Sequence, residues 1–150
     1  MNNITYRTAR PADADRINEL FIEMLNTIYS VSDAKGYEPG YTDKFFSGGD
    51  DRVFIAECDD QVIAFLSVEV YRADNCVYLD DFSVTEAFRG RGIGTMLIAS
   101  AETCAKENGV TRSVLHVEKT NEAARRFYLR HGYIENADEG QRVRMMKEIL

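Results

Sequence analysis

The sequence has few cysteines and no pattern that would use them as a cross-linked or metal-binding set. There are three cysteines, Cys58, Cys76 and Cys104, and no two of them form a Cys-x-x-Cys pair. An odd number without such a pair argues against a disulfide framework and against a thiolate zinc site. The two histidines, His116 and His131, complete no metal cluster either. We therefore expect no metal cofactor, and we expect all three cysteines to pack as small hydrophobic side chains.

Long apolar runs, repeats and low-complexity tracts are also missing. No stretch approaches the ~20 apolar residues of a membrane-spanning helix, and the N-terminal MNNITYRTAR has no apolar signal-peptide core. These absences predict a cytoplasmic protein with no membrane partner. The chain has 150 residues, of which 45% are hydrophobic, so it suits a single domain over residues 1–150 with its own core.

Basic charge is scarce and unevenly distributed. The formal net charge is −7, which argues against nucleic acid as a partner because duplex binding needs a basic face. Residues 1–85 contain 16 acidic and 7 basic side chains, whereas residues 86–150 contain 9 and 11. Either this is ordinary surface scatter, or the first part faces a cationic substrate and the second an anionic cofactor.

What is present is a series of strand-like and helix-like segments. Periodicity predicts helices over 13–28, 93–108 and 122–131, and a short helix near 41–46 within the irregular residues 29–50. Strand patterns occupy 4–9, 52–58, 61–71, 77–84, 113–118, 132–136 and 141–149. This order predicts a mixed α+β domain, in which helices flank one layer of sheet.

The densest local signal is RGRGIG at residues 89–94, directly after the strand-like VYLDDFSV. Its glycines permit positive φ and close approach of a ligand, and the helix that follows presents unpaired N–H groups at its positive end. Arg89 and Arg91 add guanidinium groups suited to phosphate oxygens. The segment therefore predicts a phosphate-bearing ligand, although its spacing matches neither GxGxxG nor GxxxxGK[ST]. The alternative is a turn that only reverses the chain.

Two motifs resemble those of one enzyme family. RGRGIG resembles the R/Q-x-x-G-x-G/A signature of the GNAT superfamily of acyl-CoA-dependent N-acetyltransferases. NEAARRFYLRHGY, residues 121–133, resembles its second signature, N-x-x-A-x-x-F-Y-x-x-x-G-F/Y. The resemblance implies a mostly antiparallel sheet of six to seven strands that is splayed at the acetyl-CoA site. It also implies acetyl-CoA as co-substrate, direct transfer through a ternary complex and, by analogy, a homodimer.

The resemblance further implies which residues hold the cofactor. The pyrophosphate is expected on the backbone amides of residues 91–95, and the pantetheine arm along residues 82–84 like an added strand. A backbone N–H near Phe82 would polarise the thioester carbonyl, and Asn121 would contact the arm beyond its role as a helix cap. The full expected set is Phe82, Ser83, Val84, Arg89, Gly90, Arg91, Gly92, Ile93, Gly94, Thr95, Asn121, Ala124 and Phe127.

The same resemblance assigns the general acid. Tyr128 occupies the position of the second signature at which the family places the acid that protonates the departing thiolate. The alternative is that Tyr128 only packs beside Phe127 and has no catalytic role.

The general base is expected on the strand before RGRGIG. YLDDF resembles YLEDF of spermidine/spermine N-acetyltransferases, where the first acid is thought to deprotonate the amine through water. This implies that Asp80 is the base and that Asp81 helps to hold a cationic substrate. Strand alternation puts Tyr78, Asp80, Phe82 and Val84 on one face, with Asp81 and Ser83 on the other. One alternative is that the acidic pair is exposed and has no catalytic role. Another is that the base is Glu69, Glu118, His116 or a relay of solvent molecules.

The acceptor is predicted to be a small cationic primary amine, such as a polyamine, a diamino acid or an aminoglycoside. Acidic residues, Glu23 among them, fall near residues 29–50, where Tyr29, Tyr37 and Tyr41 could supply aromatic walls for an ammonium group; the alternative is a solvated loop. A protein N-terminus or lysine is the second candidate acceptor. A non-catalytic acyl-CoA-binding sensor is the candidate from another functional class.

Overall fold

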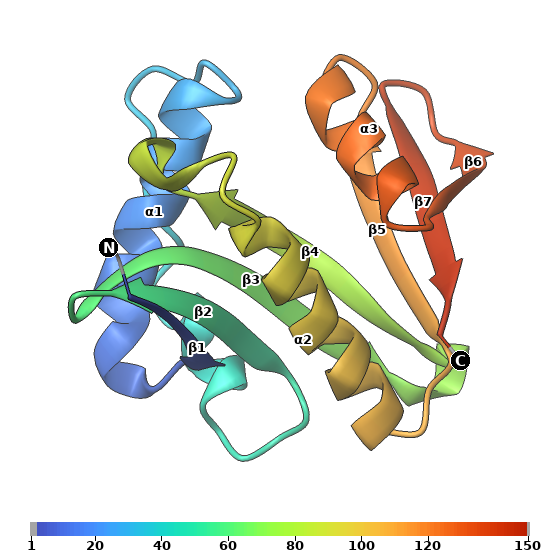
Figure 1. Cartoon of the computed structure of the whole chain (residues 1–150), viewed down its shortest axis with the longest axis horizontal. Helices are drawn as coiled ribbons and strands as arrows, with labels where there is room; N and C mark the ends of the chain where they lie inside the picture. Colours follow the sequence, from blue (N-terminus) through green and yellow to red (C-terminus); the bar gives the residue numbers. More distant parts are fainter. Residues whose placement is uncertain (1–2, 150) are drawn as a thin grey trace.

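Residues 3–149 are described in the computed structural model, where one seven-stranded sheet carries helices on both faces (Figure 1). The helices are α1 (Ala14–Thr27), α2 (Ile93–Glu107) and α3 (Glu122–Arg130), with short 3₁₀ helices at Pro11–Asp13, Tyr41–Phe45, Arg72–Asp74 and Glu86–Phe88. The strands are β1 (Ile4–Thr8), β2 (Arg52–Cys58), β3 (Gln61–Tyr71), β4 (Cys76–Val84), β5 (Arg112–Glu118), β6 (Ile134–Asp138) and β7 (Arg142–Glu148). The predicted α+β architecture is confirmed.

The sheet is mixed and mostly antiparallel, as predicted. Its strand order is β1-β2-β3-β4-β5-β7-β6, and the one parallel contact among these strands joins β4 to β5. That contact pairs only Cys76–Leu79 with Arg112–Leu115, although β4 continues to Val84 and β5 to Glu118. The two strands diverge beyond this point, as Figure 1 shows, so the predicted splay is confirmed.

Two clusters of buried side chains hold the helices to the sheet. On one face, Ile17 and Leu20 of α1 pack with Ile55 and Phe65 of the neighbouring strands. On the other, α2 buries Ile93, Leu97, Ala101 and Cys104, which recur at helical spacing along one face. The three cysteines are buried and unpaired, which confirms their predicted packing role.

A β-bulge interrupts β4 at the acidic pair. Leu66 of β3 pairs with Phe82, but Val68, two residues further on, pairs with Leu79. Two residues of β4, Asp80 and Asp81, therefore lie opposite the single intervening residue of β3, Ser67.

The bulge makes the simple alternation prediction wrong for this strand. Phe82 packs against the core on the α2 side, so it does not share a face with Asp80. The carboxylates of Asp80 and Asp81 instead both lie on the α1 side, where they accept hydrogen bonds from the hydroxyls of Tyr41 and Tyr37. One inserted residue thus brings together two carboxylates that regular pleating would separate.

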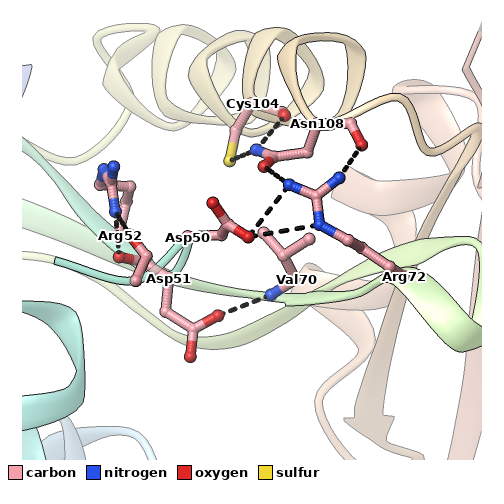
Figure 2. A network of polar contacts seen from close by, with 8 residues as sticks. Asp50, Asp51, Arg52, Val70, Arg72, Cys104 and Asn108 are labelled. Carbon is pink, nitrogen blue, oxygen red and sulfur yellow. Dashed lines mark hydrogen bonds and ion pairs between the residues drawn. The ribbon is translucent and has the colours of Figure 1, made fainter.

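The end of the sheet at the C-terminus of α2 is closed by a polar network (Figure 2). The guanidinium of Arg72 donates to the Asp50 carboxylate at 3.0 Å, and to the backbone and side-chain oxygens of Asn108, each at 2.7 Å. The N–H of Val70 donates to Asp51 Oδ1 at 2.8 Å. The network ties the loop before β2 and the β3–β4 turn to the end of α2, whose last carbonyls need such donors.

Within residues 3–149, no three His, Cys, Asp or Glu side chains are grouped so that they could hold a metal ion. In the same described part of the chain, no helix combines the length and the apolar character needed to cross a membrane.

Candidate active site

A cleft of about 740 Å³ lies where β4 and β5 diverge. Every residue of the expected cofactor set lines it except Arg91, and both expected catalytic residues, Asp80 and Tyr128, line it as well. Of the expected acceptor residues, Asp81 and Tyr29 line the cleft, whereas Glu23 and Tyr37 do not. Apart from Arg91, the cofactor and catalytic residues expected from the sequence motifs therefore line one cleft.

The edge of β4 that faces the cleft offers backbone hydrogen-bonding groups. The N–H of Thr85 donates to the carbonyl of Ile63 at 2.8 Å, and Val84 is the partner of Ala64 in the register. In an antiparallel ladder this register directs the N–H and C=O of Val84 and Phe82 away from β3. The carbonyl of Val84 accepts a hydrogen bond from Arg89 Nε at 2.8 Å, in agreement with that direction. The N–H of Phe82 therefore points toward the cleft.

The three glycines of RGRGIG serve two different purposes. Gly90 and Gly92 have φ of 76° and 79°, in the left-handed region that favours glycine. Gly94 has an ordinary helical backbone, but a Cβ there would lie 3.1 Å from Phe127 Cζ and 3.3 Å from Phe82 Cζ. The first two glycines shape the loop, and the third allows α2 to approach these rings.

The start of α2 is built as an anion site. Gly92 is the N-cap residue, and its carbonyl accepts the first helical hydrogen bond, from the N–H of Met96. The N–H groups of residues 93–95 consequently have no acceptor within the helix. They line the same cleft and carry the positive end of the helix dipole.

The two arginines of the loop are held by protein groups. Besides its bond to the Val84 carbonyl, Arg89 lies 3.7 Å from a Glu23 carboxylate oxygen, and the other oxygen of Glu23 accepts a hydrogen bond from Thr85 Oγ1 at 2.8 Å. Arg91 lies over the Phe88 ring, 4.9 Å from its centroid. Glu23, expected at the acceptor, is therefore placed beside the glycine loop.

On the opposite wall, residues at both ends of α3 line the cleft. The carbonyl oxygen of the Asn121 side chain accepts a hydrogen bond from the N–H of Ala124 at 3.2 Å, which confirms its predicted role as a cap. Tyr128 packs among Phe82, Phe127 and Tyr133. Burial raises the pKa of Tyr128, so its phenol is neutral at physiological pH and retains a proton to donate.

His131 also lines the cleft, and sequence reasoning did not assign it to the site. Its Nδ1 lies 2.8 Å from the Phe127 carbonyl, which can only accept, so Nδ1 carries the proton. In neutral His131, Nε2 then accepts a hydrogen bond from the Thr95 hydroxyl at 2.9 Å. This contact joins the first turn of α2 to the end of α3. His131 falls on an unspecified position of the second signature, so the motif gave no signal for it.

His116, an alternative base, is engaged through both ring nitrogens. Nε2 lies 3.1 Å from a Glu139 carboxylate oxygen and must donate to it, so in neutral His116 the Nδ1 atom accepts from the Tyr78 hydroxyl at 2.7 Å. The hydrogen bond from His116 lowers the pKa of Glu139. Glu69, another alternative base, forms an ion pair with Lys44. His116 would have to give up its hydrogen bond from Tyr78 before Nδ1 could accept a proton, and one carboxylate oxygen of Glu69 is occupied by Lys44.

The acidic pair at the bulge has two distinct environments. Asp80 is exposed and accepts from Tyr41 at 2.9 Å. Asp81 is part-buried and accepts from Tyr37 at 2.6 Å. Burial, and next the nearby charge of Asp80, raise the pKa of Asp81 to about 6.

Two of the tyrosines expected as aromatic walls are packed against other rings. Tyr37 stacks on Phe21 with the ring centroids 3.9 Å apart, and on Tyr41 with the centroids 4.7 Å apart. Its hydroxyl rather than its ring face is directed to the acidic pair. Tyr29, by contrast, lines the cleft and is 45% exposed.

The mixed sheet opens at the N-terminus of α2, beside strand-edge amides that face the cleft, as expected for an acyl-CoA-dependent transferase. The comparisons agree: the model of the acetyltransferase (GNAT) family matches residues 18–133. An uncharacterised N-acetyltransferase of Methanocaldococcus jannaschii is 30% identical over 125 residues, which cover 81% of this chain and 72% of the relative. The chain belongs to the GNAT family of acetyltransferases. It is accordingly an acyltransferase with acetyl-CoA as co-substrate.

Solved structures share the whole fold. The PaiA N-acetyltransferase of Thermoplasma acidophilum, in complex with coenzyme A, superposes with a TM-score of 0.81 at 20% identity and covers 97% of this chain and 99% of its own. A GNAT-family acetyltransferase of Staphylococcus aureus Mu50 has a TM-score of 0.85 at 12% identity, over 99% of this chain and 100% of its own. At these identities the likeness concerns the fold.

Proposed function

We propose that the chain transfers the acetyl group of acetyl-CoA directly to a primary amine of a small cationic acceptor, such as a polyamine, a diamino acid or an aminoglycoside. The observation that supports this proposal is a pair of acidic residues, Asp80 and Asp81, which meet at the bulge and line the same cleft as Tyr128. Two adjacent carboxylates attract an ammonium group, and one of them can take its proton. Cytoplasmic location and a homodimer belong to the same proposal.

The cofactor side of the cleft fits a pyrophosphate and a pantetheine arm. The N–H groups at the start of α2 would bind the pyrophosphate, with left-handed Gly90 and Gly92 giving it room. The outward N–H of Phe82 would hydrogen-bond the thioester carbonyl, and Asn121, which lines the same cleft, would contact the arm. Bound acetyl-CoA supplies an activated acetyl group as a thioester.

The proton chemistry is divided between the two walls of the cleft. On the β4 side, the carboxylate pair orients the ammonium and removes a proton, directly or through a water molecule. On the α3 side, the neutral Tyr128 hydroxyl donates a proton to the departing thiolate. Acid and base therefore lie on different elements that meet at one cleft.

The test combines a binding measurement with a turnover measurement. Acetyl-CoA at about 100 times its Kd is expected to stabilise the fold by about 2.7 kcal/mol, observed as a rise in Tm. Thiol release is then followed over polyamines, diamino acids, aminoglycosides and peptides. Turnover of small cationic amines supports the proposal. Turnover of peptides alone would indicate that the acceptor is a protein N-terminus or lysine. Stabilisation without turnover of any amine would instead indicate a sensor.

A further inference from the structure

The backbone at Asp81 is fixed by a buried hydroxyl. Ser67, 2% exposed, lies opposite the bulge, and its Oγ accepts the N–H of Asp81 at 2.9 Å. Ser67 Oγ also lies 3.4 Å from the Asp81 carbonyl oxygen, to which it donates. This side chain satisfies the polar groups that a bulge leaves without ladder partners. The position of Asp81 is therefore determined by β3 as well as by its own strand.

The carboxylate of Asp81 is fixed from the other side by Tyr37. The backbone N–H of Tyr37 donates to Asn18 Oδ1 at 2.7 Å, and its ring stacks on Phe21, so α1 holds it at two points. Gly36 permits this approach because a Cβ there would lie 2.2 Å from the Asn18 side chain. The Tyr37 hydroxyl then donates to Asp81 Oδ2 at 2.6 Å.

We propose that Tyr37 is a positioning residue that holds the Asp81 carboxylate as the proton acceptor for the amine, while exposed Asp80 binds the ammonium group. This inference rests on the proposed function and moves the role of base from Asp80, which the family resemblance implied, to its neighbour. Tyr37 does not line the cleft, whereas Asp80 and Asp81 do. It therefore acts through Asp81 rather than on the substrate.

The surroundings of Asp81 suit a base that works near neutral pH. Burial and the charges of Asp80 and Glu69 raise its pKa, whereas the Tyr37 hydrogen bond and Lys44 lower it, with a result of about 6. A carboxylate in this range is ionised at pH 7 and is a stronger base than an ordinary aspartate. The titratable groups that face it are Tyr29, Tyr37, Tyr41, Lys44, Glu69 and Asp80.

The proposal predicts opposite pH shifts for two variants. Tyr37→Phe keeps the stacked ring but removes a donor to the charged form, so the acid limb of the kcat/KM profile should move up by about one pH unit. Asp80→Asn removes a neighbouring negative charge, so the same limb should move down while KM for the amine rises. Asp81→Asn should abolish the limb and lower kcat about a hundredfold or more.

Tyr41→Phe is the matched control, since it removes the hydroxyl bound to Asp80 instead. It should raise KM for the amine and leave the acid limb within about 0.3 units, a shift too small to reflect a lost charge-assisted hydrogen bond. Carbon-13 NMR of the labelled aspartate carboxyls should reproduce these shifts without turnover.

The proposal would be overturned if the acid limb of the kcat/KM profile persisted in Asp81→Asn and disappeared in Asp80→Asn. It would also be overturned if the acid limb of Tyr37→Phe lay at the same pH as that of the wild-type protein. Failure of the proposed function gives a different pattern. In that case the wild-type protein would show no acetyl-CoA stabilisation or no amine-dependent thiol release.

Discussion

At the scale of single residues, burial of Tyr128 raises the pKa of its phenol and so favours the protonated form. Tyr128 packs among Phe82, Phe127 and Tyr133 and lines the cleft. Tyr128→Phe should lower kcat about a hundredfold or more, because it removes the hydroxyl that we propose protonates the thiolate. Isothermal titration should show that acetyl-CoA affinity is largely retained, because the ring and its packing remain.

Tyr133→Phe provides the control for that substitution. The Tyr133 hydroxyl hydrogen-bonds Ser113 Oγ at 2.6 Å in the core, away from the acidic pair. Its loss should reduce the free energy of unfolding by about 1 kcal/mol and leave kcat nearly unchanged. Equal kcat values for Tyr128→Phe and the wild-type protein would remove the acid role from Tyr128.

Asp81 also makes a residue-scale prediction about stability. Its pKa is raised from 3.8 to about 6 in the folded state, so the folded protein binds more protons between these values than the unfolded chain. Its stabilising contribution is complete below about pH 4 and is lost as the pH rises through about 6. Relative to Asp81→Asn, the wild-type free energy of unfolding should therefore fall by about 2 to 3 kcal/mol over this range.

Urea titrations of both proteins at several pH values measure this difference. If it stays constant from about pH 4 to pH 8, Asp81 titrates in the folded protein as it does in the unfolded chain. That result would exclude a raised pKa for Asp81 in the folded protein. It would also remove the electrostatic argument for Asp81 as the base.

At the scale of elements, Gly94 sets how closely α2 approaches α3. Alanine is the better helix former by about 1 kcal/mol, yet its Cβ would lie 3.1 Å from Phe127 Cζ. Gly94→Ala should therefore leave Tm within a few degrees of wild type and weaken acetyl-CoA binding about tenfold, because the rings must shift into the cleft. Titration calorimetry measures the affinity.

Gly49→Ala is the matched control for this change, since a Cβ at Gly49 meets nothing within 4 Å and its φ is not positive. It should change neither affinity nor Tm appreciably. Unaltered affinity in Gly94→Ala would mean that the close approach of α2 to these rings does not affect the binding site.

The Arg72 network of Figure 2 belongs to the fold rather than to the chemistry. Arg72→Ala should lower the free energy of unfolding by about 1 kcal/mol; more is not expected, because Arg72 and Asp50 are both more than half exposed. Urea unfolding measures this loss, and kcat should be unchanged. Arg126→Ala, which removes an exposed pair with Glu122 at 3.9 Å, should cost much less.

The helices and strands were predictable from the sequence because each has a characteristic spacing or composition of apolar residues. The apolar stripe of α2 and the β-rich composition of residues 52–58 and 61–71 give nearly the bounds observed. The bulge at Asp80-Asp81 was not predictable, since it is defined by pairing with Ser67, and that partner lies on another strand. His131 was missed for a related reason: its site role comes from a contact with Thr95 across the cleft.

At the scale of the whole molecule, the cleft exists because the sheet is nearly two sheets. β1–β4 and β5–β7 are joined by the short parallel pairing of Cys76–Leu79 with Arg112–Leu115. The acidic pair and the glycine loop belong to the first part, and α3 with Tyr128 belongs to the second. A ligand in the cleft contacts both parts, so its binding should be coupled to how firmly they are held together.

Hydrogen exchange tests this coupling directly. Saturating acetyl-CoA should slow amide exchange in residues 82–84, in residues 93–95 and in α3 together, because the ligand bridges both parts of the sheet. Exchange in β1 and β2, which lie away from the cleft in the strand order, should change little. Tyr128→Phe should give the same protection pattern, since we propose that its hydroxyl transfers a proton rather than holds the ligand. Protection confined to one side of the cleft would contradict a bridging mode and would place the ligand on a single wall.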